Sequence, residues 1–252
     1  RLAMIYSATG KEELTLKMFE DLTEDFPDKY DLYYTMAELY RKQGRLEDAL
    51  ETLVQIENVF GSSDMTAIAR FDILRELGRE EEGYSYLEEF NRKYSSVQVL
   101  SLLGDRQLSM YNDSLALVLY TEALDIDPSF APALLGKAET YRITRKYDNY
   151  FSTLYDFVGN DNVSVEGKCG YITALVRSAD KMFMKSFGSQ MDSLVNLCSE
   201  KYPRDSSVNY MAGIYYYAKG DSANAVDRFR ANTENWPGSL SAAASYIEML
   251  MY

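Results

Sequence analysis

Residues 213–237 read GIYYYAKGDSANAVDRFRANTENWP, and the spacing of a few positions in this stretch decides the fold. A small residue, Gly213, is followed by an aromatic residue at 216 and by a second glycine at 220. A second small residue at 225, an aromatic residue at 229 and a proline at 237 complete the series. Small residues let two helices cross closely, glycine with a positive φ ends a helix, and proline cannot continue one. The stretch therefore predicts two antiparallel helices joined by a turn near Gly220.

The same series recurs along the chain at a nearly constant interval. Its first position falls, at intervals of 34, 34, 33 and 34 residues, on Ala3, Ala37, Phe71, Gly104 and Ala138. The aromatic position recurs at Tyr6, Tyr40, Tyr141 and Tyr216, and the turn glycine recurs at Gly10, Gly44, Gly78 and Gly220. Tyr111 and Arg145 stand where two of the turn glycines are missing, and we expect Asn112 to supply a left-handed residue beside the first. A fixed period of this length indicates stacked repeats.

This spacing resembles the tetratricopeptide repeat family over most of the chain. The resemblance implies an all-α, right-handed superhelical solenoid of antiparallel helix pairs, with about seven repeats plus a terminal helix. Its first helices would line a concave groove. We expect one solenoid over 1–252, with copies at 1–29 (partial), 30–63, 64–96, 97–130, 131–164, 165–205, 206–239 and 240–252 (partial). Segment 165–205 lacks a clean series, and we interpret it as a divergent, lengthened copy.

The composition excludes several classes of protein. With 46% apolar residues, the chain is too hydrophobic for a disordered protein. A net charge of −13 argues against binding to nucleic-acid phosphates, and no apolar run is long enough to span a membrane. The sequence contains no histidine and no familiar catalytic or nucleotide-binding motif. We therefore expect no enzyme, no catalytic residue, no cofactor and no metal site.

The two ends and the two cysteines leave several questions open. The sequence starts at Arg1 without a secretory signal pattern and ends in the apolar segment 240–252, so both ends are expected to be cut from a longer protein. The compartment, cytoplasmic or periplasmic, stays open. Cys169 and Cys198 fall on the two expected helices of the divergent copy. Either they form a disulfide across that helix pair or they are two buried small hydrophobic residues.

An acidic residue follows the small residue of the first helix in four successive copies. Helical spacing directs it away from the partner helix and into the expected groove, at Glu38, Asp72, Asp105 and Glu139. This acidic ladder departs from the asparagine that the family more often carries there. One interpretation is a strip that attracts a basic or amide-rich peptide. The other is self-neutralisation, because Arg41, Arg75 and Arg142 lie three residues further on in three of these copies.

Eight of the 22 tyrosines fall into two groups. Those at repeat positions are expected in the core, namely Tyr6, Tyr40, Tyr120, Tyr141 and Tyr216. Tyr34, Tyr210 and Tyr217 fall on the expected groove face, where exposed tyrosines make good contacts to a partner. Packing against the adjacent copy is the alternative for these three.

The residues and the resemblance together predict a non-catalytic scaffold that binds a peptide or partner protein in its groove. The alternative is a sensory or regulatory segment of a larger enzyme or transcription regulator. Self-association through the apolar terminal helix, with Ile247, Leu250 and Met251, is a further possibility.

Overall fold

The protein is described by a computed structural model of residues 12–251. Within this range the chain is helical, without strands, and it divides into two compact units, residues 1–123 (unit 1) and 124–252 (unit 2). Unit 1 contains α2 (Glu12–Asp25), α3 (Tyr30–Lys42), α4 (Leu46–Phe60), α5 (Asp64–Glu76), α6 (Glu80–Tyr94) and α7 (Val97–Ser109). The boundary between the units falls inside α8 (Asp113–Ile126). Unit 2 contains α9 (Ala131–Ile143), α10 (Tyr147–Gly159), α11 (Val165–Ser178), α12 (Lys181–Lys201), α13 (Ser206–Lys219), α14 (Ser222–Asn235) and α15 (Leu240–Leu250).

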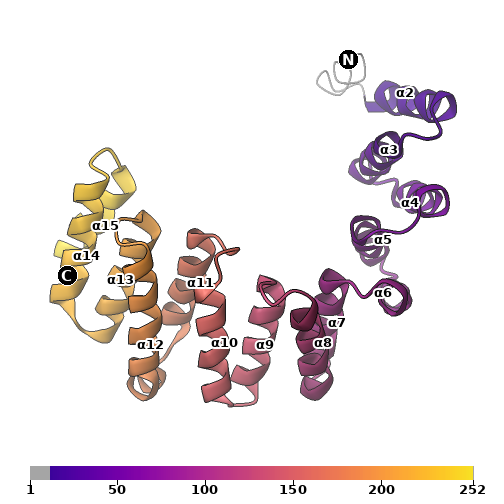
Figure 1. Cartoon of the computed structure of the whole chain (residues 1–252). Helices are drawn as coiled ribbons and strands as arrows, with labels where there is room; N and C mark the ends of the chain where they lie inside the picture. Colours follow the sequence, from indigo (N-terminus) through magenta and orange to yellow (C-terminus); the bar gives the residue numbers. More distant parts are fainter. Residues whose placement is uncertain (1–11, 252) are drawn as a thin grey trace. The chain divides into compact units, whose positions relative to one another are not determined.

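Most helices that follow one another in the sequence pack side by side within each unit (Figure 1). Extensive packing joins α3 to α4 and α5 to α6 in unit 1, and α9 to α10 and α13 to α14 in unit 2. In unit 2, α11 also packs on α13, which brings the first helices of successive pairs together. The predicted all-α architecture of packed helix pairs is confirmed. The assignment of particular ranges to repeats stays a prediction.

The turns inside the pairs share one geometry, whether or not they contain glycine. Gly44, Gly78 and Gly220 have φ values of 72°, 73° and 85°, as predicted for residues that end a helix, whereas Gly10 lies outside the described residues. Tyr111 and Arg145 occupy the same turn position, each with a φ of 59°. In all five turns the next amide donates to the carbonyl five residues earlier, at 2.8–2.9 Å. The expectation for Asn112 was wrong, because the hydrogen-bonded turn holds the preceding residue in the left-handed region regardless of its type.

Two glycines at the helix crossings are required by close packing. A Cβ atom at Gly104 would lie 2.7 Å from the Tyr120 ring, and one at Gly213 would lie 2.7 Å from the Phe229 ring. Real Cβ atoms do not approach so closely, so the predicted close crossing is confirmed at both pairs. Ala3 lies outside the described residues.

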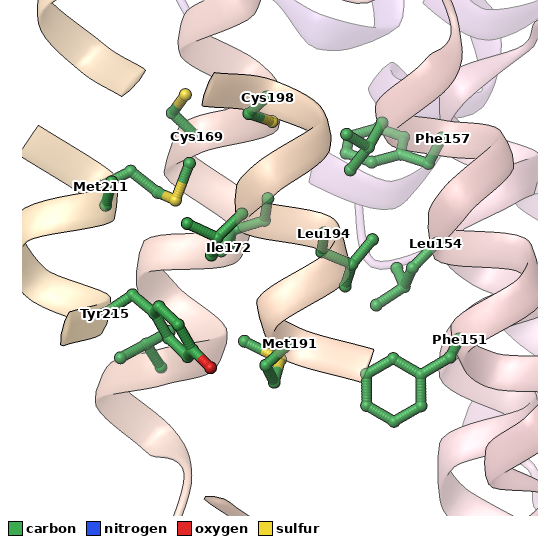
Figure 2. Packing of buried hydrophobic residues seen from close by; sticks show 14 of the residues in the cluster. Phe151, Leu154, Phe157, Cys169, Ile172, Met191, Leu194, Cys198, Met211 and Tyr215 are labelled. Carbon is green, nitrogen blue, oxygen red and sulfur yellow. The ribbon is translucent and has the colours of Figure 1, made fainter. Parts of the chain in front are cut away.

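The apolar core differs between the units. Unit 1 contains separate smaller clusters, whereas α9 to α13 of unit 2 share one continuous cluster; Figure 2 shows part of it around Ile172 and Leu194. Of the expected core tyrosines, Tyr40 and Tyr120 are buried and Tyr141 and Tyr216 are half-buried, whereas Tyr6 lies outside the described residues.

Helix α13 has a core tyrosine that the repeat spacing did not predict, Tyr215, next to the expected Tyr216. The side chain of Tyr215 is fully buried, and its hydroxyl donates to Asp192 of α12 at 2.8 Å. Tyr216 is half-buried and packs against the core clusters on both sides of α13, so both neighbouring tyrosines contribute to the core.

The divergent segment owes its extra length to its second helix. At 21 residues, α12 is long, and Phe187 interrupts it with a non-helical φ of −119°. The rings of Phe183 and Phe187 pack on Tyr147 and Phe151 of α10 with centroids 4.5–6.4 Å apart. These four rings anchor the added helical turns to the preceding pair.

Tyrosine hydroxyls link helices to carboxylates in both units. Tyr40 donates to Glu20 at 2.8 Å, Tyr120 donates to Asp105 at 2.6 Å, and Tyr86 donates to Glu57. Burial, together with the acceptor carboxylate, raises the pKa of Tyr40 to about 12. Part of the tyrosine excess therefore serves intramolecular contacts.

Candidate partner-binding groove

An apolar cavity of about 450 Å³ lies along one face of α13. Tyr210, Ile214 and Tyr217 are four and three residues apart, so they project from the same side of the helix and line this cavity together. Phe229 of α14 and Met249 of α15 complete its apolar wall, and its remaining lining residues are Arg177, Ser245 and Glu248. Tyr217 is 49% exposed, which leaves its ring available to a partner.

A larger cavity of about 710 Å³ adjoins the apolar cavity, and we call it the polar cavity because most of its lining residues have polar side chains. Both cavities share Arg177, Tyr210 and Ser245 as lining residues. Small and hydroxyl-bearing side chains from the first helices line the polar cavity, namely Gly170, Thr173 and Ala174 of α11, Ser206 and Ser207 of α13, and Ser241 and Ala242 of α15. We call the two adjoining cavities the unit 2 groove.

The side chains of Arg177 and Tyr210 form the shared wall of the groove. The guanidinium of Arg177 donates to the Tyr210 hydroxyl at 2.9 Å, and the Tyr210 ring meets Phe229 edge-on with centroids 6.0 Å apart. Both residues are thus held in place before any partner arrives. Within the described residues, no carboxylate lies at ion-pair distance from Arg177, so its charge is available to a ligand.

Asn232 of α14 contributes an unused hydrogen-bond acceptor to the polar cavity. The residue is only 3% exposed, and its Oδ1 atom has no hydrogen-bond partner within the described residues. Buried polar atoms are nearly always hydrogen-bonded, because an unpaired one carries a desolvation cost of about 1–3 kcal/mol. The atom itself is buried, so a ligand N–H or O–H donor would reach it only after neighbouring side chains move.

The acidic ladder is mostly occupied by intramolecular partners. Asp72 pairs with Arg75 at 2.9 Å and Glu139 pairs with Arg142 at 2.6 Å, as the self-neutralisation hypothesis predicted. Arg41, the predicted partner of Glu38, pairs instead with Glu76 of α5, at 2.5 Å. The long arginine side chain reaches the neighbouring helix pair, where Glu76 offers its Oε1 to both Nε and Nη2.

Asp105, the ladder residue without an arginine three positions on, accepts a hydrogen bond from Tyr120. Although the residue as a whole is exposed, desolvation of the carboxyl raises its pKa against the opposing effect of that hydrogen bond. This position is therefore tied to its own helix pair.

Tyr34 of α3 also has partners inside unit 1. It is half-buried and stacks on Tyr30 with centroids 6.0 Å apart and an interplanar angle of 14°. The structure does not place Tyr34 and Tyr210 in one site, because they belong to different units.

Comparison with known proteins agrees with this architecture. Residues 7–65 match the sequence profile of a family described as tetratricopeptide repeat. A tetratricopeptide repeat protein from Parabacteroides merdae is 14% identical, with a TM-score of 0.50 over 99% of this chain and 96% of that chain. The C-terminal part of a TPR repeat-containing protein from Cytophaga hutchinsonii is 12% identical, with a TM-score of 0.51 over 97% and 98%. The described part of the chain therefore has the fold of tetratricopeptide repeat proteins, and residues 7–65 resemble that family in sequence.

Other comparisons limit what the family implies. The structure of pilF from Pseudomonas aeruginosa is 13% identical, with a TM-score of 0.52 over 88% of this chain and 96% of that chain. At such identities the likeness shows the fold alone. No curated protein matches the sequence. The tetratricopeptide repeat fold is generally that of a non-catalytic protein-interaction scaffold.

Two negative findings apply to the described part of this chain. None of its described helices is long and apolar enough to cross a membrane. Across residues 12–251 there is also no group of three or more cysteine, aspartate or glutamate side chains arranged to hold a metal ion.

Sequence reasoning missed several residues of the unit 2 groove. Ile214 follows Gly213, so it occupies the same position in this tetratricopeptide repeat as the acidic ladder does in others, and that signal could have identified it. Arg177 lies in the divergent segment and Asn232 lies on a second helix. Neither residue stands at a recurring position of the repeat. They line the same cavity only because four helices pack together there.

Proposed function

We propose that this chain is a non-catalytic interaction scaffold that binds an extended segment of a partner protein in the unit 2 groove. The observation that carries the proposal is the row of Tyr210, Ile214 and Tyr217 along one apolar cavity, next to a polar cavity with an unpaired acceptor at Asn232. An apolar cavity beside a few fixed polar groups is the usual composition of a binding site.

The groove suits a segment with an apolar side chain next to exposed main-chain amides. Burying that side chain between Tyr217 and Met249 would contribute about 1.5–3 kcal/mol. A main-chain N–H of the ligand would satisfy Asn232, and the serine hydroxyls beside it can donate to ligand carbonyls or accept from its amides. The ordered pair Arg177 and Tyr210 would lower the entropic cost of binding, because its geometry exists before the ligand arrives.

A preference for basic peptides along the acidic ladder remains a separate prediction. The pairs made by Asp72, Glu139 and Asp105 reduce the charge available there, so the unit 2 groove has the stronger support.

A displayed library of random peptides tests the proposal. Selection on the immobilised chain should enrich sequences with an apolar or aromatic anchor, and synthetic versions should bind in a fluorescence anisotropy titration. Tyr217→Ala and Ile214→Asp should each weaken binding at least about tenfold, the loss expected for one anchor contact worth 1.4 kcal/mol. Tyr111→Asn is the matched control, because Tyr111 is 89% exposed in a unit 1 turn and asparagine tolerates its left-handed backbone.

Two results would contradict the proposal. One is a library that yields no binder for a correctly folded chain. The other is a set of selected peptides whose affinity is the same for the wild type, Tyr217→Ala and Ile214→Asp.

A further inference from the structure

Two cysteine side chains meet inside unit 2. Cys169 of α11 and Cys198 of α12 are free thiols, 3% and 1% exposed, in one core cluster. Figure 2 shows them on the two helices at the same end of that cluster. The two thiols are near enough to influence each other's ionisation, because each is the largest cause of the other's pKa shift. A disulfide between them requires Cα atoms about 4.4–6.8 Å apart.

A buried lysine lies beside this pair. Lys168 is 0% exposed, its Nζ has no hydrogen-bond partner within the described residues, and it lies 5.5 Å from the centre of the Tyr202 ring. The amide of Tyr202 donates to the carbonyl of Cys198 one helical turn earlier, at 2.9 Å. The unpaired ammonium is therefore held at the end of α12 that carries Cys198.

The surroundings distinguish the two thiols. The hydrogen bond from Cys169 lowers the pKa of Cys198, and the charges of Lys168 and Lys201 act in the same direction against the effect of burial. The same hydrogen bond raises the pKa of Cys169, with burial and the charges of Asp205 and Glu166 acting in the same direction. Cys198 is thus the thiol that ionises more readily, and Cys169 keeps its proton.

A small molecule has a path to the pair. Cys169 lines the polar cavity of the unit 2 groove, which has a volume of about 710 Å³. A molecule the size of hydrogen peroxide can therefore approach the pair from the side of Cys169, with Cys198, 1% exposed, behind it.

We propose that Cys169 and Cys198 are a reversible redox pair, which a small peroxide oxidises to a disulfide that ties α11 to α12. The Cys198 thiolate attacks one peroxide oxygen and breaks the O–O bond, which leaves a sulfenic acid and a hydroxide that is protonated to water. Cys169 then loses its proton, and its sulfur displaces the second hydroxide from Cys198 to form the S–S bond. Two thiols are oxidised and one peroxide is reduced to two waters. A dithiol reductant reverses the change.

Peroxide treatment of the reduced, purified chain tests this inference. The oxidised product should be a monomer lighter by two hydrogen atoms, and peptide mapping should join the peptides of Cys169 and Cys198. Dithiothreitol should restore both free thiols. Because the bond closes a loop of 29 residues, the oxidised form should melt about 5–10 °C higher than the reduced form.

Single variants test the assigned roles of the two thiols. In Cys169→Ser the sulfenic acid cannot be resolved, so dimedone should label Cys198, whereas Cys198→Ser should stay unlabelled. Lys168→Met keeps the length of the side chain without its charge, so it should raise the pKa of Cys198 and slow oxidation by lowering the thiolate fraction. Circular dichroism checks that each variant is folded, and Cys169→Ala replaces Cys169→Ser if the serine variant is not.

Three results would overturn the inference. They are a folded wild type that stays a dithiol while the same peroxide oxidises glutathione, disulfides formed only between chains, and dimedone labelling of Cys169 in Cys198→Ser. An unchanged oxidation rate in folded Lys168→Met would overturn the role given to the lysine.

Discussion

The two units of the chain differ in how they use their charged side chains and their core. In unit 1, arginines cross from one helix pair to the next, as in Arg41–Glu76 (2.5 Å), Arg70–Glu57 (2.7 Å) and Arg106–Glu81 (2.5 Å). In unit 2 one continuous core joins α9 to α13. A lysine makes an ion pair between helix pairs there, Lys219–Asp192 (2.6 Å), and Arg177 has no carboxylate partner within the described residues.

The cavities follow the same division. Those of unit 2 reach about 710 Å³, whereas the one beside Tyr86 in unit 1 has a volume of about 250 Å³. Polar side chains that bridge neighbouring pairs fill the surface between them, so they leave less room for a ligand. A unit held together by apolar packing can leave polar groups such as Arg177 and Asn232 for a partner. The two units thus apply one repeat architecture in two ways.

The largest expected effect comes from overpacking a helix crossing in unit 2. Gly213→Leu places a side chain where even a Cβ atom would lie 2.7 Å from the Phe229 ring, and it should destabilise unit 2 by about 3 kcal/mol. Urea unfolding followed by circular dichroism measures the loss. The control is Gly170→Ala in α11, whose Cβ would meet no atom within 4 Å, and which should be neutral or stabilising by up to about 1 kcal/mol. Equal midpoints for both variants would show that core packing does not hold unit 2 together.

The corresponding test in unit 1 removes a buried carboxylate. The side chain of Glu57 is 9% exposed and binds both Arg70 and the Tyr86 hydroxyl, so Glu57→Gln should lower the free energy of unfolding by about 2–3 kcal/mol. Glu81→Gln removes another ion pair, but the side chain of Glu81 is 86% exposed, and the loss should stay below about 0.5 kcal/mol. The same urea titration compares them. If Glu57→Gln cost no more than Glu81→Gln, the ion pairs of unit 1 would not be its main link between helix pairs.

A smaller effect should appear at alkaline pH. Tyr40 has its pKa raised from 10.0 to about 12 in the folded chain, so the unfolded chain loses this proton first as the pH rises. The stabilisation from Tyr40 is therefore complete below pH 10.0 and is lost between pH 10.0 and about 12. Tyr40→Phe should be less stable by about 1 kcal/mol at pH 9, and the difference should shrink across that window. Urea midpoints at several pH values measure it, and a constant difference would contradict the assignment.

The smallest effect concerns self-association, which stays a prediction. Ile247, Leu250 and Met251 of the C-terminal segment are 58%, 59% and 78% exposed. If α15 joins two chains, the double variant Ile247→Asp and Leu250→Asp should shift sedimentation toward the monomer at high protein concentration. A wild type that is monomeric at all concentrations would contradict self-association through this surface.

The sequence predicted the features that depend on local spacing. The helix pairs, the positive φ at Gly44 and the close crossing at Gly213 all follow from residue types at fixed intervals. The shared face of Tyr210 and Tyr217 follows from helical periodicity in the same way.

Features that depend on contacts between pairs could not be predicted in this way. Arg41 has acidic residues within reach on its own helix and on α5. Only the packing of the two helices determines that it forms an ion pair with Glu76. The left-handed turns at Tyr111 and Arg145 contradict local preference, because the hydrogen-bonded turn holds them there. Asn232 and Arg177 reach one groove from helices 55 residues apart in the sequence.

Hydrogen exchange of the chain with and without a library-selected peptide tests the central claim most directly. The account predicts slower exchange in α11, α13 and α15, which line the unit 2 groove, and no change in α3, α5 and α7, which carry Tyr34 and most of the acidic ladder. Slower exchange in α3, α5 and α7 with none around Tyr210 and Tyr217 would contradict it, and would place partner binding in unit 1.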